Sequence, residues 1–208
     1  ILDFLDERGI ADNTVVLFMS DNGGNSIAPA KGGVMHHGNA PLREGKGSVY
    51  EGGIREPMIV RWPGVVPPGS RTDAPVIIED FFPTLLEIAG VSAPQMLQQI
   101  DGKSFLPVLK NPEAGDRLRP LAWHYPNKWK KEDEQDIDFM SAWRQGEWKL
   151  VYRMTSQTLE LYNLKDDLEE RRNLADQHPE KVAELAKAMS AQFRKWGALM
   201  PTRKKDGR

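Results

Sequence analysis

The chain has 208 residues, 39% of them hydrophobic, which is enough to bury a core in one large or two small domains. Lys and Arg total 28 against 30 Asp and Glu, and the resulting net charge of −2 excludes the broad basic field that binding to nucleic acid would require. The sequence has no cysteine, which excludes disulfides and thiolate metal sites, and no apolar run of the roughly 20 residues that a bilayer span needs.

The N-terminal segment predicts a helix followed by a strand. Apolar residues at helical spacing predict a short helix over residues 1–8, which Gly9 is suited to end. Because the chain starts on this pattern and not on Met, we expect it to be a piece of a longer polypeptide. The β-branched and aromatic run at residues 14–19 predicts a strand that is covered on both faces in a parallel sheet.

The next elements continue an α/β order. Residues 54–62 predict a second strand, and residues 76–91 predict an amphipathic helix with Pro83 near its first turn and Gly90 at its end. Residues 111–116 have the composition of a linker. We therefore place a domain boundary there, with an α/β portion over residues 1–112 and a second domain over residues 113–208.

The C-terminal domain is predicted to be a small antiparallel sheet with a long helix. Four short aromatic or β-branched segments predict its strands, at residues 121–125, 139–144, 148–153 and 158–163. The charge run at residues 128–138 is interpreted as a solvated loop. Apolar residues at steps of three and four predict the helix over residues 179–196, with one face packed on the sheet.

Polar residues with metal-ligand chemistry follow the first predicted strand. The sequence SDNGG places the Asp21 carboxylate and the Asn22 amide side by side, where open α/β sheets bind substrates. Such hard oxygen ligands suit calcium or magnesium. Taken alone, such a pattern is more often an ordinary turn than a metal site.

A second candidate site lies in the segment LREGKGSVYEGGIREP, residues 42–57. Lys46 is flanked by glycines, so its ammonium can approach an anion closely and form a charge-assisted hydrogen bond. The alternative is a flexible surface loop with a solvated lysine. Arg43 and Arg55 either support the anion site or pair with neighbouring glutamates.

Together these motifs resemble the type I sulfatases of the alkaline phosphatase superfamily. The similarity continues through DFFPTLLEIAG (80–90), DGKSFLPVL (101–109), WRQGEWKL (143–150) and ELYNLKDDLEERRNLA (160–175), and so covers nearly the whole chain. It implies the C-terminal portion of such an enzyme, with an α/β fold: the later part of the alkaline-phosphatase-like sandwich, followed by the antiparallel subdomain with its helix.

The resemblance also implies roles for particular residues. Asp21 and Asn22 would complete a Ca²⁺ site, and Lys46 would contact sulfate and take part in catalysis. His124 would approach the substrate from the C-terminal subdomain, or is instead a packed, hydrogen-bonded structural residue beside its aromatic neighbours. His36 and His37 lie between the two motifs and either face substrate or are solvated.

The nucleophile that the resemblance implies is absent from this chain. It is a formylglycine made from Cys or Ser in a C/S-x-P-x-R motif, which these 208 residues do not contain, so we expect the isolated chain to be inactive. The expected substrate of the complete protein is an aryl or carbohydrate sulfate ester. The resemblance to this family suggests that the complete protein is located in the periplasm or outside the cell of a bacterium.

Two alternatives stay open. The first is a phosphate or phosphonate ester hydrolase of the same superfamily, and the second is a non-catalytic, sulfatase-like binding module. Oligomeric state is not specified by the sequence.

Overall fold

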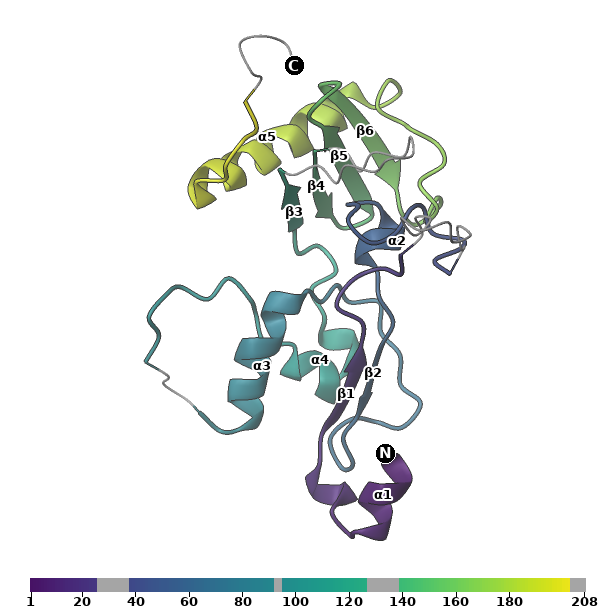
Figure 1. Cartoon of the computed structure of the whole chain (residues 1–208), viewed down its shortest axis with the longest axis vertical. Coiled ribbons are helices and arrows are strands. Elements are labelled where there is room, and N and C mark those ends of the chain that lie inside the picture. The colour runs from purple at the N-terminus through teal and green to yellow at the C-terminus, as the bar shows by residue number, and fades with distance from the viewer. Residues whose placement is uncertain (26–37, 92–94, 127–138, 203–208) are drawn as a thin grey trace, which may run out of the picture. The chain divides into compact units, whose positions relative to one another are not determined.

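A computed structural model describes residues 1–25, 38–91, 95–126 and 139–202 of the chain (Figure 1). The chain forms two compact units. The first unit comprises Ile1–Asp21 and Pro57–Arg119, and the second comprises Asn22–Glu56 and Pro120–Arg208. The charge run at residues 128–138 and the pair His36 and His37 lie outside the described residues.

The first unit contains helices, short 3₁₀ turns and one pair of strands. Its elements in chain order are α1 (Leu2–Glu7), η1 (Ala11–Asn13), β1 (Val16–Met19), β2 (Met58–Arg61), η2 (Ile78–Asp80), α3 (Phe81–Ile88), α4 (Leu106–Lys110) and η3 (Pro112–Ala114). Its core is built from Phe105, Leu106 and Leu109, against which both β2 and α3 pack.

The prediction of a parallel, doubly covered strand at residues 14–19 is wrong for this structure. β1 pairs with β2 in an antiparallel ladder in which Phe18 lies opposite Ile59, and these side chains are 65% and 64% exposed. An unbroken apolar run is compatible with either strand direction, because direction depends on the neighbouring strand and not on side-chain alternation.

The helix in the segment 76–91 is shorter than the hydrophobic pattern predicts. The 3₁₀ turn η2 comes first and α3 then begins at Phe81, which places Pro83 in the first turn, where its missing N–H costs nothing. Gly90 follows the helix at a φ of +73°, which confirms its predicted role as the stop.

A buried ion pair fixes the start of this helix. The Asp80 carboxylate, with no exposed surface, accepts hydrogen bonds from the Ile77 and Lys103 amides and from both Nη atoms of Arg119, at 2.6 and 2.8 Å. Charge-assisted bonds of this bidentate kind hold three segments of the first unit together.

The second unit confirms the predicted antiparallel sheet. Its strands are β3 (Leu121–Tyr125), β4 (Met140–Gln145), β5 (Trp148–Arg153) and β6 (Thr158–Asn163), paired in sequence order. Helix α5 (Pro179–Trp196) has the predicted bounds and ends at Gly197, which adopts a φ of +63°.

The two faces of this sheet have different partners. Helix α5 covers one face of the sheet (Figure 1). On this face, Leu150 and Leu161 pack against Leu185, Met189 and Phe193 of α5. On the other face, a second cluster includes Val151 and Tyr162 of the sheet together with Val49 and Tyr50. The segment that leads into the short helix α2 (Glu51–Ile54) therefore covers the sheet face opposite α5.

This packing assigns Asn22–Glu56 to the same unit as the C-terminal sheet. The sequence-based division at residue 112 kept that stretch within the N-terminal portion. Among the described residues, no helix combines the length and apolar character that crossing a bilayer requires.

Candidate functional site

The two motifs singled out in the sequence meet through their backbones in the second unit. The Gly23 N–H donates to the Gly53 carbonyl at 3.0 Å, and the Lys46 N–H donates to the Gly24 carbonyl at 3.1 Å. Residues 22–24, from the SDNGG motif, therefore lie directly beside the segment that carries Lys46.

Glycines make this close approach possible. A Cβ atom on Gly23 would lie 1.9 Å from the Gly52 carbonyl oxygen, which is far inside van der Waals contact. Likewise, a Cβ on Gly52 would lie 2.4 Å from the Arg43 carbonyl oxygen, and one on Gly53 would lie 2.2 Å from that of Ser48. These three positions need glycine for space and not for backbone conformation.

A side-chain amide bridges the two motifs. The Asn39 Nδ2 donates to the carbonyls of Gly24 and Glu44, at 2.7 and 3.0 Å. Glu44 and Gly47, on either side of Lys46, both have positive φ values of 59° and 90°. The chain thus turns sharply around Lys46, whose side chain is exposed.

The candidate metal ligands stand at the start of this arrangement. Asp21 is exposed and Asn22 is half-buried, and together they offer a carboxylate and an amide oxygen. Hard oxygen donors fit calcium, which takes about six to eight of them, so this pair fits as part of a larger donor set. Within the described ranges, no three His, Asp or Glu side chains gather as a metal site.

His124 has internal partners for both ring nitrogens. Nε2 lies 2.7 Å from the Leu199 carbonyl, to which it must donate, and Nδ1 lies 2.8 Å from the Ser141 hydroxyl. The ring also contacts Phe193 of α5, at 4.8 Å between centroids. In this structure His124 ties β3 to the chain after α5, and neither nitrogen points to the Lys46 segment.

Sequence reasoning missed a set of buried charges beneath that segment. Lys149 on β5 has no exposed surface, and its Nζ lies 2.8 Å from Glu51 Oε1 and 2.9 Å from Glu170 Oε1. The Glu170 carboxylate also accepts the Glu51 backbone N–H at 2.6 Å. We call Glu51, Lys149 and Glu170 the buried triad. Of the two alternatives for Arg55, the structure shows the ion pair, because Arg55 Nε lies 2.5 Å from Glu51 Oε2.

Burial and charge act in opposite directions on the two carboxyls of the triad. Burial favours a raised pKa for Glu51, but the positive charges of Lys149 and Arg55 prevail and lower it. For Glu170, burial prevails over Lys149 and raises the pKa. The two glutamates therefore have their pKa values displaced in opposite directions.

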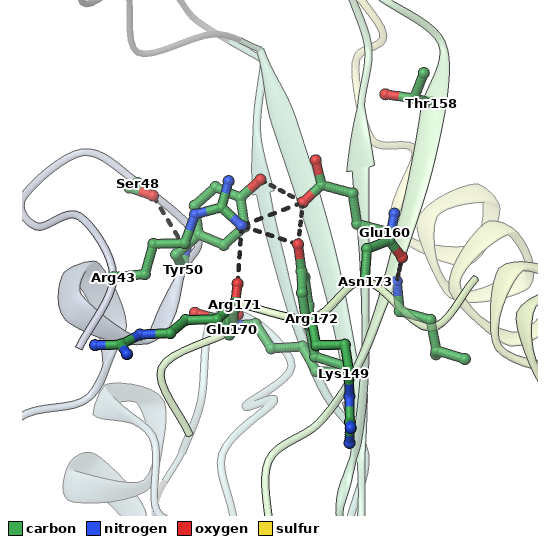
Figure 2. A network of polar contacts seen from close by, with 12 residues as sticks. Arg43, Ser48, Tyr50, Lys149, Thr158, Glu160, Glu170, Arg171, Arg172 and Asn173 are labelled. Atoms are coloured by element: carbon green, nitrogen blue, oxygen red, sulfur yellow. Dashed lines mark hydrogen bonds and ion pairs between the residues drawn. The ribbon is translucent and has the colours of Figure 1, made fainter. Parts of the chain in front are cut away.

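A second polar group surrounds Arg43, three residues before Lys46 (Figure 2). Its Nη1 donates to the Tyr162 hydroxyl at 2.9 Å and to the Glu170 carbonyl at 3.1 Å, and its guanidinium lies 3.7 Å from the centre of the Tyr50 ring. The hydroxyls of both tyrosines donate to Glu160 Oε2, at 2.6 and 2.7 Å. Burial raises the pKa of each tyrosine, so both remain hydrogen-bond donors.

One feature of the sequence is related to these contacts, but it can be interpreted only once the fold is known. A charged residue between apolar neighbours in β5, as in Trp148-Lys149-Leu150, is unusual on a covered strand. Without knowledge of what covers each face, the alternation is equally typical of a lysine that faces solvent.

Residues 45–198 match the family model described as N-sulphoglucosamine sulphohydrolase, C-terminal. This match covers well over half of the chain, and the chain belongs to that sulfatase family.

Individual relatives agree with this assignment. A sulfatase of Formosa agariphila is 40% identical over 194 residues, which are 90% of this chain and 34% of that protein. A protein solved in complex with its substrate D-glucosamine-2-N,6-O-disulfate aligns with 94% of this chain and 37% of its own, at 26% identity and a TM-score of 0.70. Ps i-CgsB in complex with k-i-k-neocarrahexaose aligns with 95% and 39%, at 28% identity and a TM-score of 0.69.

The chain spans about a third of the length of these relatives. Its fold is the α/β fold of the sulfatases, as the sequence predicts.

Proposed function

We propose that the longer protein containing this chain hydrolyses sulfate esters, and that this chain contributes the cation that holds the sulfate, Lys46. The observation that carries the proposal is the backbone pairing of Gly24 with Lys46 and of Gly23 with Gly53. Through these bonds, the loop beginning at Asn22 lies beside an exposed lysine in a sharply turned segment. An ammonium held in this way can neutralise charge on sulfuryl oxygens and on the departing oxygen.

Asp21 and Asn22 are the residues that would hold Ca²⁺. Their oxygens would supply part of its coordination, and the remaining ligands and the formylglycine nucleophile would come from sequence outside these 208 residues. When bound, calcium supplies Lewis-acid stabilisation of the sulfate oxygens.

A sulfated carbohydrate is the substrate class that we favour, with aryl sulfates as the alternative. Two structural relatives above 25% identity support this choice, since one was solved with a glucosamine disulfate and the other with a neocarrahexaose. Residues outside this chain would complete the walls of the binding site.

The rival enzymatic function is hydrolysis of phosphate or phosphonate esters, because a divalent cation and an ammonium suit either anion. The experiment is to compare the complete protein on a sulfate and a phosphate ester of the same phenol. We expect sulfate turnover to exceed phosphate turnover. Preferred phosphate cleavage would replace our proposal with the rival.

Lys46→Ala tests the lysine directly. Loss of a group that stabilises charge in the transition state lowers kcat by about 10²–10³-fold. Lys165→Ala, at an exposed lysine of the same unit, is the control and should leave kcat at the wild-type value. Wild-type kinetics for Lys46→Ala would remove the lysine from the site.

A non-catalytic, sulfatase-like module is the second alternative. The C/S-x-P-x-R motif distinguishes the two, since the enzyme requires it in the complete protein. A protein that lacks the motif would not turn over the sulfate ester. For location we propose the periplasm or the exterior of a bacterial cell, and cell fractionation with an antibody to this chain tests it.

A further inference from the structure

We infer that the buried triad of Glu51, Lys149 and Glu170 positions the Lys46 segment, so that the C-terminal sheet sets the geometry of the anion-binding motif. The inference rests on the proposed role of Lys46. It assigns the three residues a positioning role, since none of them belongs to the motif's exposed face.

The segment carrying Lys46 is held at both of its ends by the C-terminal sheet and its loop. Before Lys46, Arg43 donates to the Tyr162 hydroxyl of β6 and to the Glu170 carbonyl. After Lys46, the Glu51 carboxylate binds Lys149 of β5, and the Glu51 N–H is bound by the Glu170 carboxylate. Residues 43–51 are therefore anchored on either side of the lysine.

Glu170 is the residue common to both anchors. Its carbonyl binds Arg43 and its carboxylate binds Glu51, and its backbone adopts a positive φ of 54°. The loop around it is also fixed, because the Asp167 carboxylate accepts the Arg171 and Arg172 amides at 3.1 and 2.8 Å. A short, ordered loop after β6 thus reaches both ends of the Lys46 segment.

The anchoring extends to the other motif. Gly52 and Gly53 follow Glu51 directly in α2, and the Gly53 carbonyl accepts the Gly23 N–H. A shift of Glu51 would move this acceptor. The triad therefore also fixes the glycines that follow Asn22.

A fixed position of the Lys46 segment explains these buried charges better than added stability of the fold does. Removing three charged groups from water is costly, and an apolar set of similar volume often stabilises a fold as well or better. Charged groups differ from apolar ones in that their bonds fix direction and distance. On a sheet face that otherwise packs Val49 and Tyr50 against Val151, the triad adds a defined register between the segment and β5.

Glu170→Gln in the complete protein is the sharpest test. Glutamine keeps the shape but offers one acceptor oxygen and one NH₂ group, so either the Lys149 ammonium loses one of its two carboxylate partners or the Glu51 N–H loses its acceptor. The matched control is Asp80→Asn, an isosteric change at an equally buried carboxylate of the first unit that contacts neither motif segment.

Two measurements are made on both variants. The first is amide exchange at Lys46, Glu51 and Gly23, compared with the β4–β5 ladder. The second is kcat and KM on a sulfate ester. For Glu170→Gln we expect exchange at the three amides to rise about tenfold or more relative to the ladder, as local opening requires. We also expect kcat to fall about tenfold or more with KM changed less, as a displaced transition-state contact requires. Asp80→Asn should change neither the exchange at the three amides relative to the ladder nor kcat.

The outcomes are distinct. Wild-type exchange at the three amides in Glu170→Gln overturns the inference, as does a loss of kcat that Asp80→Asn reproduces. Should Lys149→Met also fold, it must give the same local exchange pattern. If the wild-type protein turns over no sulfate ester, the proposed function fails, and the exchange measurement alone still decides whether the triad anchors the segment.

Discussion

Lys149 is a lysine without exposed surface, held between two carboxylates on the covered face of a sheet. Lysines are almost never fully buried unless they are paired. Removing the ammonium would leave the Glu51 and Glu170 carboxylates facing each other in a site that water does not reach. The stability of the folded chain should therefore depend strongly on the Lys149 side chain.

Lys149→Met should therefore lower the free energy of unfolding by about 3–5 kcal/mol, the cost of breaking a buried pair by removing one partner. Urea unfolding of the 208-residue chain measures it. The control is Lys165→Met, because Lys165 pairs with Glu147 at 3.3 Å on the surface, and an exposed pair contributes at most about 1 kcal/mol. Equal effects of the two changes would contradict the buried pairing.

The two glutamates of the triad should give opposite pH profiles. The lowered pKa of Glu51 means that its stabilising contribution is present above the ordinary value of 4.5 and is lost as pH falls through its folded pKa. The raised pKa of Glu170 means that its contribution is present below 4.5 and is lost as pH rises through its folded pKa.

Unfolding of Glu51→Gln and Glu170→Gln over a pH series from about 3 to 7 tests both signs. The stability advantage of wild type over Glu51→Gln should shrink as pH falls below 4.5. Relative to wild type, Glu170→Gln should gain stability as pH rises above 4.5. Parallel profiles for the three proteins would show that neither carboxyl has the displaced pKa inferred for it.

At the scale of elements, the close approach of the two motif backbones depends on glycines. Gly23 lies against the backbone of α2, where no flexible group can move aside for a Cβ atom. Gly24 is different, since the nearest neighbour of a Cβ atom there would be the Asn39 side chain, with Oδ1 at 2.8 Å.

Gly23→Ala should cost about 1–3 kcal/mol, as overpacking against a rigid surface does, and should increase amide exchange at Lys46. Gly24→Ala is the matched control and should cost less, because a Cβ atom there meets the end of the Asn39 side chain at 2.8 Å, whereas a Cβ atom on Gly23 meets backbone at 1.9 Å. Thermal unfolding and exchange of the 208-residue chain measure both variants. A larger effect for Gly24→Ala would mean that the motifs do not meet at Gly23.

At the scale of the whole molecule, the chain carries only part of the proposed metal site. Asp21 and Asn22 offer two ligand side chains with three oxygens between them, whereas calcium takes about six to eight. The 208-residue chain alone should therefore bind Ca²⁺ weakly, and calorimetric titration should show no saturation at micromolar ion concentrations, of the order at which calcium sensors bind. Tight binding at one ion per chain would mean that the chain holds a complete site.

Local pattern was sufficient for much of the architecture. The four strands from Leu121 to Asn163 and helix α5 follow from alternation and from the 3.6-residue period, which are properties of neighbouring residues. Gly90 ends α3 in the left-handed conformation, a stop that the sequence predicts because glycine adopts this conformation at low cost. Chemistry and spacing made Lys46 and the SDNGG motif candidates with plain alternatives, and the resemblance to the sulfatases selected them.

Long-range contacts were decided only by the tertiary structure. Pairing of β1 with β2 in the antiparallel direction, the internal partners of His124 and the burial of Lys149 each depend on residues distant in the chain. A hydrophobic period reports which side of an element is covered, but it carries no information on which element covers it. For that reason the sequence determined the family, the strands and the candidate anion-binding lysine, whereas the fold alone revealed the buried charges that hold this lysine's segment on the C-terminal sheet.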